Sequence, residues 1–253
     1  MTSFEISLIT LLCLAAGFGL GLWLQHRLPG HHLSKESQDT IKLGAGMVTT
    51  MSALVLGLLV SSAKNSFDSV NNSIAQSGAR VIQLDLLLSQ YGPETRNVRD
   101  RLKAYVSARV EAVWGKPTGA VSGLKSVEKS NSILEFHASL RNLTPQTELQ
   151  KSLLNQVFQV AGEMQQSRLL VLEEQQDSLP TVFLVLLVGW LGMLFLSFGL
   201  FSPRNPTVFA VMLLCAISVA SAVFLILEMS HPLDGLIKVS PAPLLKALEL
   251  IGH

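Results

Sequence analysis

The sequence predicts an all-α membrane protein with four transmembrane helices and an extramembrane helical bundle inserted between the second and third spans. Three observations predict it: four apolar stretches of spanning length, a polar stretch with helical periodicity between them, and few charged residues. Only 15% of the 253 residues are charged, whereas an ordinary soluble domain carries about 25%. This composition argues against a cytosolic enzyme and against a disordered chain, which needs the opposite composition.

The four apolar stretches cover residues 6–24, 43–63, 179–201 and 207–227, and none contains Asp, Glu, Lys, Arg or His. Each has the length of about 20 residues that an α-helix needs to cross a bilayer. Core helices of a large soluble protein rarely run this long without a charged edge residue. The first stretch is longer than the core of a signal peptide and no Lys or Arg precedes it, so we expect a retained span.

The polar stretch at residues 64–178 holds 13 of the 19 basic and 12 of the 18 acidic residues, so its net charge is close to zero. Its apolar residues recur at spacings of three and four, which predicts helices. The first stripe follows the second apolar stretch without a breaker, so one long helix is expected as far as Gln90, where Tyr91-Gly92-Pro93 ends it. That stripe consists of Phe67, Val70, Ile74, Ser77, Val81, Leu84 and Leu88.

Three more helices are expected in the polar stretch, with a loop at residues 115–119 and a short helix at residues 126–140. Thr144 as a hydroxyl N-cap with Pro145 in the first turn predicts the start of the last helix, which runs towards Pro180. The stripe of the second helix consists of Val98, Leu102, Val106, Val110 and Val113. The stripe of the last consists of Leu149, Leu153, Val157, Val160, Met164 and Val171.

After the fourth apolar stretch, Pro232 stops the helix, Asp234-Gly235 predicts a turn, and Ser240-Pro241 opens a last short helix. This tail is apolar but too short to span, so we expect it at the membrane interface or packed against protein. The expected domains are a first transmembrane hairpin (residues 1–63), a helical domain (64–178), a second transmembrane hairpin (179–227) and an interfacial tail (228–253).

An even number of spans places both termini and the helical domain on one side of the membrane. The short loops on the other side, at residues 25–42 and 202–206, carry four basic residues against five on the opposite flanks. This balance does not decide the orientation by the positive-inside rule. Because positive charge follows the first span rather than preceding it, we expect the helical domain on the non-cytoplasmic side of a bacterial inner membrane.

Small residues share one helical face of the second span, and they allow two interpretations. One is close helix–helix packing, as in other membrane proteins, and the other is a pore lining whose hydroxyls face water. These residues are Gly46, Thr50, Ala53, Gly57 and Ser61. Similar small pairs occur in the first span, at Gly17 and Gly21, and in the fourth, at Ala216 and Ala220.

Three ionisable residues stand at predicted membrane boundaries: Lys64 after the second span, Glu228 at the end of the fourth, and Asp234 beyond it. Such groups mark an ion route or simply the headgroup layer. A histidine cluster after the first span, His26 with His31 and His32, would need a further ligand and a second shell to hold a metal. Asp39 or Glu36 could supply that ligand, but a metal site is the less favoured interpretation. We therefore expect no metal and no cofactor.

Neither catalysis nor nucleic-acid binding is expected. No nucleophile–base, P-loop or HExxH pattern is present. The formal net charge is +1, and no nucleic-acid-binding motif is legible. The expected partners are the lipid bilayer, further copies of the chain and small ions.

Three stretches, ALVLGLLVSSAKNSFDSV (53–70), YGPETRNVRDRLKAYV (91–106) and EMSHPLDGLIKVSPAPL (228–244), resemble a bacterial bestrophin-like membrane family. Bestrophins are pentameric anion channels whose second span lines the pore, so the resemblance implies membrane placement and a homo-oligomer. Their acidic calcium clasp has no counterpart here, and neither has their aromatic constriction, since the second span contains no Phe, Tyr or Trp. The leading hypothesis is an oligomeric channel-like pore lined by the second span. The alternative is a membrane-anchored sensor or scaffold that acts through its helical domain with a partner protein.

Overall fold

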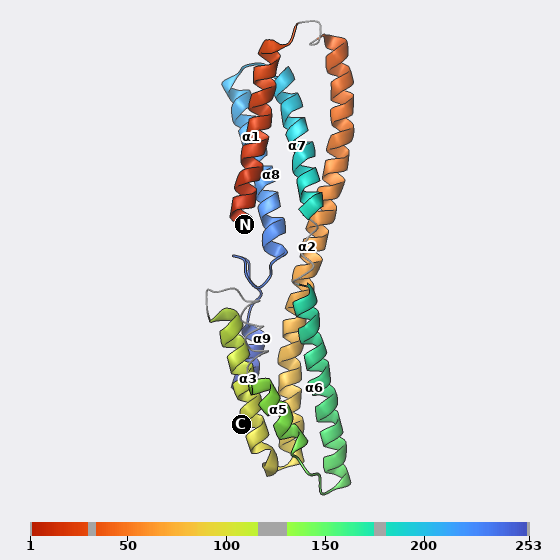
Figure 1. Cartoon of the computed structure of the whole chain (residues 1–253), viewed down its shortest axis with the longest axis vertical. Coiled ribbons are helices and arrows are strands. Elements are labelled where there is room, and N and C mark those ends of the chain that lie inside the picture. Colours follow the sequence, from red (N-terminus) through yellow and green to blue (C-terminus); the bar gives the residue numbers. More distant parts are fainter. Residues whose placement is uncertain (1, 30–33, 116–130, 175–180, 252–253) are drawn as a thin grey trace. The chain divides into compact units, whose positions relative to one another are not determined.

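The computed structural model describes residues 2–29, 34–115, 131–174 and 181–251, and every regular element in these ranges is a helix (Figure 1). The chain forms two compact units. The first, the membrane unit, comprises Met1–Asn65 and Ser178–Ser230, and the second, the helical unit, comprises Ser66–Asp177 and His231–His253. The predicted all-α class with four long apolar helices is confirmed.

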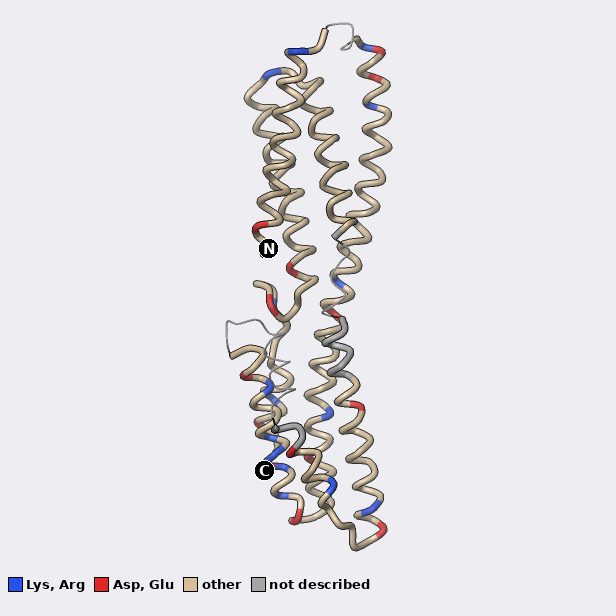
Figure 2. The backbone as a smooth tube through the Cα atoms, in the orientation of Figure 1, with Lys and Arg blue, Asp and Glu red and all other residues tan. Residues whose placement is uncertain are grey.

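The membrane unit contains α1 (Ser3–Arg27), the first part of α2 (Lys35–Tyr91), α7 (Thr181–Phe201) and α8 (Pro206–Met229). All four helices are long and apolar enough to cross a membrane. Figure 2 shows why: the charged residues of α1 and α8 lie near the helix ends and leave the middle uncharged, and α7 carries no charged residue at all.

One predicted boundary in this unit is wrong. The loop expected at residues 25–42 is shorter, because α1 continues to Arg27 and α2 already begins at Lys35. The hydroxyl of Ser34 accepts the N–H of Ser37 at 3.3 Å and so caps the first turn of α2. The polar residues that follow contain no breaker, so the helix enters the apolar stretch uninterrupted.

The glycine pair of α1 packs against the backbone of α7. A Cβ on Gly17 would lie 2.8 Å from the carbonyl oxygen of Gly192, and one on Gly21 would lie 2.9 Å from Cα of Gly199. Only glycine permits so close an approach, which is the geometry that small-residue motifs provide in membranes. On α8, Ala216 is buried with Phe18 of α1 in one apolar cluster, and Ala220 is buried as well. Helix packing is therefore the role of these small residues.

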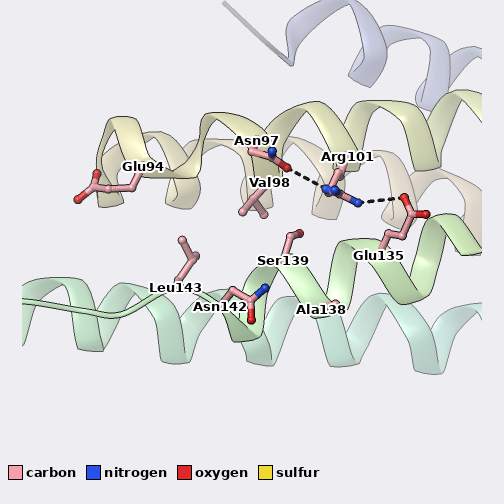
Figure 3. Close-up of a pocket in the computed structure, with 9 residues that line it drawn as sticks. All are labelled: Glu94, Asn97, Val98, Arg101, Glu135, Ala138, Ser139, Asn142 and Leu143. Atoms are coloured by element: carbon pink, nitrogen blue, oxygen red, sulfur yellow. Dashed lines mark hydrogen bonds and ion pairs between the residues drawn. The ribbon is translucent and has the colours of Figure 1, made fainter.

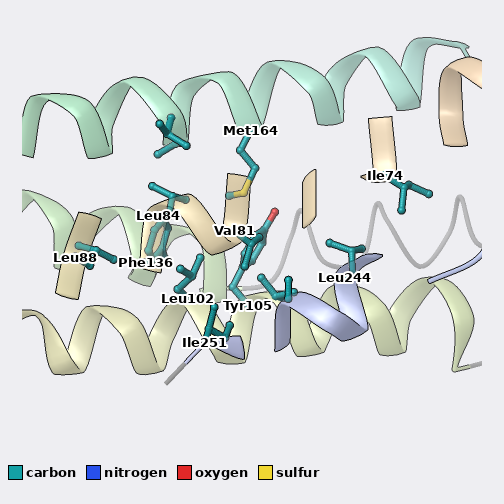
Figure 4. Packing of buried hydrophobic residues seen from close by; sticks show 14 of the residues in the cluster. Ile74, Val81, Leu84, Leu88, Leu102, Tyr105, Phe136, Met164, Leu244 and Ile251 are labelled. Atoms are coloured by element: carbon teal, nitrogen blue, oxygen red, sulfur yellow. The ribbon is translucent and has the colours of Figure 1, made fainter. Parts of the chain in front are cut away.

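The helical unit contains the rest of α2, η2 (Pro93–Thr95), α3 (Arg96–Trp114), α5 (Asn131–Arg141), α6 (Glu148–Glu174) and α9 (Ala242–Leu250). Their apolar stripes meet in one core, which Figure 4 shows from close by. The stripes predicted for α2 and α3 are confirmed, with Phe67 and Val110 partly buried at the margin of the core. The fully buried members include Leu84, Leu88, Leu102, Tyr105 and Phe136.

The predicted break after Gln90 is confirmed. Helix α2 ends at Tyr91, and Gly92 has φ 140°, a conformation that glycine adopts without a steric penalty. The hydroxyl of Thr95 then donates to the carbonyl oxygens of Leu88 at 2.6 Å and Gly92 at 2.7 Å. This contact ties the start of α3 to the end of α2.

The predicted start of α6 is wrong. The helix begins at Glu148 rather than at Thr144-Pro145, because the hydroxyl of Thr147 accepts the N–H of Gln150 at 3.1 Å and makes Thr147 the N-cap. The first residue of the predicted stripe, Leu149, is accordingly 69% exposed. The remaining stripe residues from Leu153 to Met164 are buried as expected, and the side chain of Val171 lies outside the described residues.

The short helix predicted at residues 126–140 corresponds to α5, Asn131–Arg141. Residues 126–130, the loop residues 116–119 and Pro180 lie outside the described part of the chain.

The tail packs into the helical unit, one of the two positions left open for it. Leu244, Ala247 and Ile251 join its buried core, and the indole N–H of Trp114 donates to the carbonyl oxygen of Val239 at 2.9 Å. The predicted turn is present, since the N–H groups of Asp234 and Gly235 both donate to the carbonyl oxygen of His231 at 3.1 Å.

A buried ion pair joins α2 to α3 within the helical unit. The guanidinium of Arg99 grips the carboxylate of Asp85 with two bonds, Nε to Oδ1 at 2.7 Å and Nη2 to Oδ2 at 2.8 Å. The hydrogen bond to Asp85 raises the pKa of Arg99, against the opposing effect of burial. Since Asp85 is only 6% exposed, removing Arg99 would leave the buried carboxylate of Asp85 without its guanidinium partner, which is destabilising.

Candidate functional site

The part of α2 in the membrane unit presents one packed face. Leu59 and Ala63 are buried against Leu187 of α7 and Ile226 of α8. Ser52 lies on the same helical face and is 3% exposed, and its hydroxyl has no hydrogen-bond partner among the described residues. This face fixes which side of α2 is turned towards the rest of the unit.

The five small residues predicted as a site lie on the opposite side of α2, which we call the small-residue face. All five, Gly46, Thr50, Ala53, Gly57 and Ser61, are exposed. A Cβ built on Gly46 or Gly57 would meet no atom of the described residues within 4 Å. Within the described chain these residues therefore pack against no other helix, in contrast to Gly17 and Gly21.

The hydroxyls on and beside this face are engaged with the helix itself. Thr49 donates to the carbonyl oxygen of Ala45 at 2.8 Å, and Thr50 donates to that of Gly46 at 3.0 Å. A hydroxyl that donates in this way retains acceptor lone pairs for water. The face thus keeps hydroxyl oxygens that can accept hydrogen bonds, although it lies in an apolar stretch.

A second exposed face, which we call the bulky face, runs beside the small-residue face and was missed by the sequence reasoning. It consists of Leu43, Met47, Leu54 and Leu58, all at least 63% exposed. Their helical spacing is visible in the sequence, but only the structure shows that none of the described residues covers them. Of the most apolar window of α2, 11% is buried, against 33% for α1 and 22% for α7 and α8. Of the four long apolar helices, α2 therefore has the smallest share of its apolar window covered by other described residues.

The predicted boundary charges have three different settings. Lys64 is exposed and continues the small-residue face by helical spacing, while Lys42 is exposed near the other end of that face. Glu228 is 5% exposed in the last turn of α8. Asp234 is exposed in the turn that follows in the helical unit. Of these predicted boundary residues, Lys64 alone extends the small-residue face.

The predicted histidine cluster lies only partly within the described residues. His31 and His32 fall outside them, and Nε2 of His26 accepts a hydrogen bond from Arg204 at 3.3 Å. In the described ranges, no three side chains of the metal-binding types come together.

The helical unit has a polar groove between α3 and α5 that sequence reasoning did not find (Figure 3). Its volume is about 370 Å³. Arg101 crosses it, with Nη1 at 2.9 Å from Oε2 of Glu135 and Nε donating to Asn97 at 2.8 Å. The groove is lined by Glu94, Asn97, Val98, Arg101, Glu135, Ala138, Ser139, Asn142 and Leu143. No sequence motif marks it, since its residues come from separate helices.

Tyr91 lies near one end of this groove in a small apolar cluster with Leu143 and Leu153. Its hydroxyl is buried and has no hydrogen-bond partner among the described residues. Burial raises the pKa of Tyr91, and the neighbouring carboxylate of Glu94 raises it further. The phenol therefore stays neutral at physiological pH.

Comparison with known proteins agrees with the membrane helices. The family described as "Bestrophin-like domain" matches residues 12–244, which is nearly the whole chain. No curated protein and no solved structure matches it.

Proposed function

Since the chain belongs to the bestrophin-like family, we propose that it is a membrane protein whose copies assemble around a channel-like pore lined by α2. The observation that carries the proposal is the small-residue face, which is exposed although it lies in the middle of a spanning helix. One helix encloses no pore, so several copies must contribute an α2 around a common axis. The homo-oligomer is therefore part of the proposal.

Two properties of the small-residue face suit a pore lining. Glycine and alanine leave the backbone carbonyls of α2 open to water, and the threonine hydroxyls retain acceptor lone pairs. The bulky face beside it is fully apolar and suits lipid or a neighbouring subunit. The division of α2 into three faces thus matches what a pore-lining helix needs.

Small inorganic anions are the proposed permeant ions. The innermost charges at both ends of the small-residue face are lysines, Lys42 and Lys64. An acidic residue lies one turn further out at each end, Asp39 beyond Lys42 and Asp68 beyond Lys64. Positive charge at a pore mouth raises the local concentration of anions.

The helical unit is proposed to stand outside the bilayer on the non-cytoplasmic side of a bacterial inner membrane. Its charge content supports a position in water, and the positive charge after the first span supports this orientation. We propose transport rather than catalysis, because no nucleophile–base signature is legible in the sequence.

Chloride efflux from liposomes tests the proposal. The purified full chain in liposomes should release trapped chloride faster than empty vesicles do. Gly57→Phe on the small-residue face should lower this flux at least about tenfold, since a large ring would fill a narrow lumen. Leu58→Phe on the bulky face is the matched control and should conduct like the unchanged protein. If the flux of several anions and cations, at several pH values, does not exceed that of protein-free vesicles, the proposed pore is contradicted.

The sensor or scaffold is the second candidate, and the groove between α3 and α5 favours it. Arg101 and Glu135 there are 40% and 56% exposed, so their charges are accessible to a partner's polar groups. The test is whether the chain purifies as a monomer or dimer together with one stoichiometric partner protein. Loss of that partner in the Arg101→Ala variant would favour this function over the pore.

A further inference from the structure

One end of the membrane unit gathers cationic and aromatic side chains from two separate segments. The last turns of α1 carry Trp23, His26 and Arg27, and the turn between α7 and α8 carries Arg204. Nη1 of Arg204 lies 3.3 Å from Nε2 of His26, and its Nη2 donates to the carbonyl oxygen of Leu22 at 3.4 Å. Arg204 thus lies against the last turns of α1, which end at Arg27, and we call these four residues the basic collar.

The basic collar lies where lipid headgroups are expected. The uncharged stretch of α1 ends at residue 24, and that of α8 begins at residue 207. Charged residues that directly follow a span reach into the headgroup layer, and tryptophan is enriched at the same depth. Trp23 is 56% exposed, as a side chain in contact with lipid would be.

The two guanidiniums of the collar are available to an anion. In the part of the chain that the structure describes, neither Arg27 nor Arg204 forms an ion pair with a carboxylate, and both are exposed. The guanidinium of Arg27 lies over the indole of Trp23, 5.2 Å from the ring centroid, which orients it without using its N–H groups. The contacts of Arg204 use fewer donors than a guanidinium offers.

We propose that the basic collar binds the phosphate of an anionic phospholipid, with Arg27 and Arg204 as the recognising groups. The planar fork of arginine matches two phosphate oxygens. The first turn of α8, whose end is electropositive, follows Arg204 at Pro206. Basic residues directly beside a transmembrane helix are attracted to anionic lipid headgroups. This site is separate from the small-residue face and does not depend on conduction.

Native mass spectrometry of the detergent-purified full chain tests the site. The protein is titrated with dioleoyl phosphatidylglycerol and, separately, with dioleoyl phosphatidylcholine, and lipid adducts are counted. The unchanged protein should retain the anionic lipid preferentially. The double variant Arg27→Gln, Arg204→Gln should lower its occupancy roughly tenfold, as expected for lost charge-assisted hydrogen bonds.

The matched control is Lys35→Gln, which removes one exposed positive charge from the first turn of α2 in the same unit. It should bind like the unchanged protein. Equal binding by the double variant and the control would overturn the site, and so would equal retention of the two lipids. If millimolar inorganic phosphate displaces the lipid, the ligand of the basic collar is free phosphate rather than a phospholipid, and the proposal is contradicted. If the double variant does not fold, Arg27→Gln alone, on an exposed side chain, decides by the same criteria.

Discussion

Two sets of small residues in the membrane unit have opposite surroundings. Gly17 and Gly21 of α1 touch the backbone of α7, whereas Gly46 and Gly57 of α2 meet no atom of the described residues within 4 Å of an added Cβ. In sequence the two sets look alike, with small residues at helical spacing in an uncharged stretch. A small-residue motif therefore predicts close packing but does not identify the packing partner. The structure shows whether another helix of the same chain is that partner.

The largest expected difference between the two sets is in how much a leucine substitution lowers the free energy of unfolding. Leucine at position 21 would drive its Cβ into the backbone of α7, where the amide nitrogen of Leu200 is 2.8 Å away. We expect Gly21→Leu to lower the free energy of unfolding by about 3 kcal/mol. Gly57→Leu, in open space, should change it by less than about 1 kcal/mol. Thermal unfolding of both variants in detergent, followed by helical circular dichroism, measures the difference. Equal losses of stability in the two variants would contradict the distinction between packed and uncovered glycines.

Charge at the ends of the small-residue face should set ion preference. We expect the double variant Lys42→Glu, Lys64→Glu to lower the permeability ratio of chloride to sodium by roughly tenfold, because the attracting field changes sign. Reversal potentials across a planar bilayer in asymmetric salt measure this ratio. A control pair on α6 and α3, Lys151→Glu and Lys103→Glu, should leave it unchanged. An unaltered chloride-to-sodium permeability ratio in the Lys42→Glu, Lys64→Glu variant would show that these lysines do not influence the permeating ions.

The smallest expected effect concerns hydroxyls. Thr50→Val keeps the shape of the side chain and removes its polar oxygen from the small-residue face, so chloride flux should fall by about twofold. The matched change is Thr10→Val in α1, where the hydroxyl donates to the carbonyl oxygen of Ile6 at 2.9 Å inside the packed unit. That variant should conduct normally. Equal flux in the two variants would mean that Thr50 does not face the conducting water.

Much of the fold could be predicted because it depends on local pattern. Uncharged length alone identified the four spans, and helical spacing identified the buried stripes of α2 and α3. The start of α6 was missed because two threonines three residues apart both suit an N-cap, and only the hydrogen bond to Gln150 identifies Thr147.

The site was less predictable, because it depends on contacts between segments. Spacing grouped Gly46, Thr50 and Gly57 on one face, but it contained no information on which helix lies opposite. The bulky face and the groove at Arg101 involve ordinary residue types whose exposure or proximity arises only in the folded chain. The meeting of Arg204 with His26 joins residues far apart in sequence, and no motif records it.

Cysteine accessibility tests the pore-lining role of α2 most directly. In a background with Cys13→Ser and Cys215→Ser, single cysteines replace Ala53 and Gly57 on the small-residue face and Leu54 and Leu58 on the bulky face. A charged, water-soluble thiosulfonate should react at positions 53 and 57 and block chloride flux, and leave flux unchanged at positions 54 and 58. Block at 54 and 58 with no reaction at 53 and 57 would contradict the account, because water would then lie against the other face of α2.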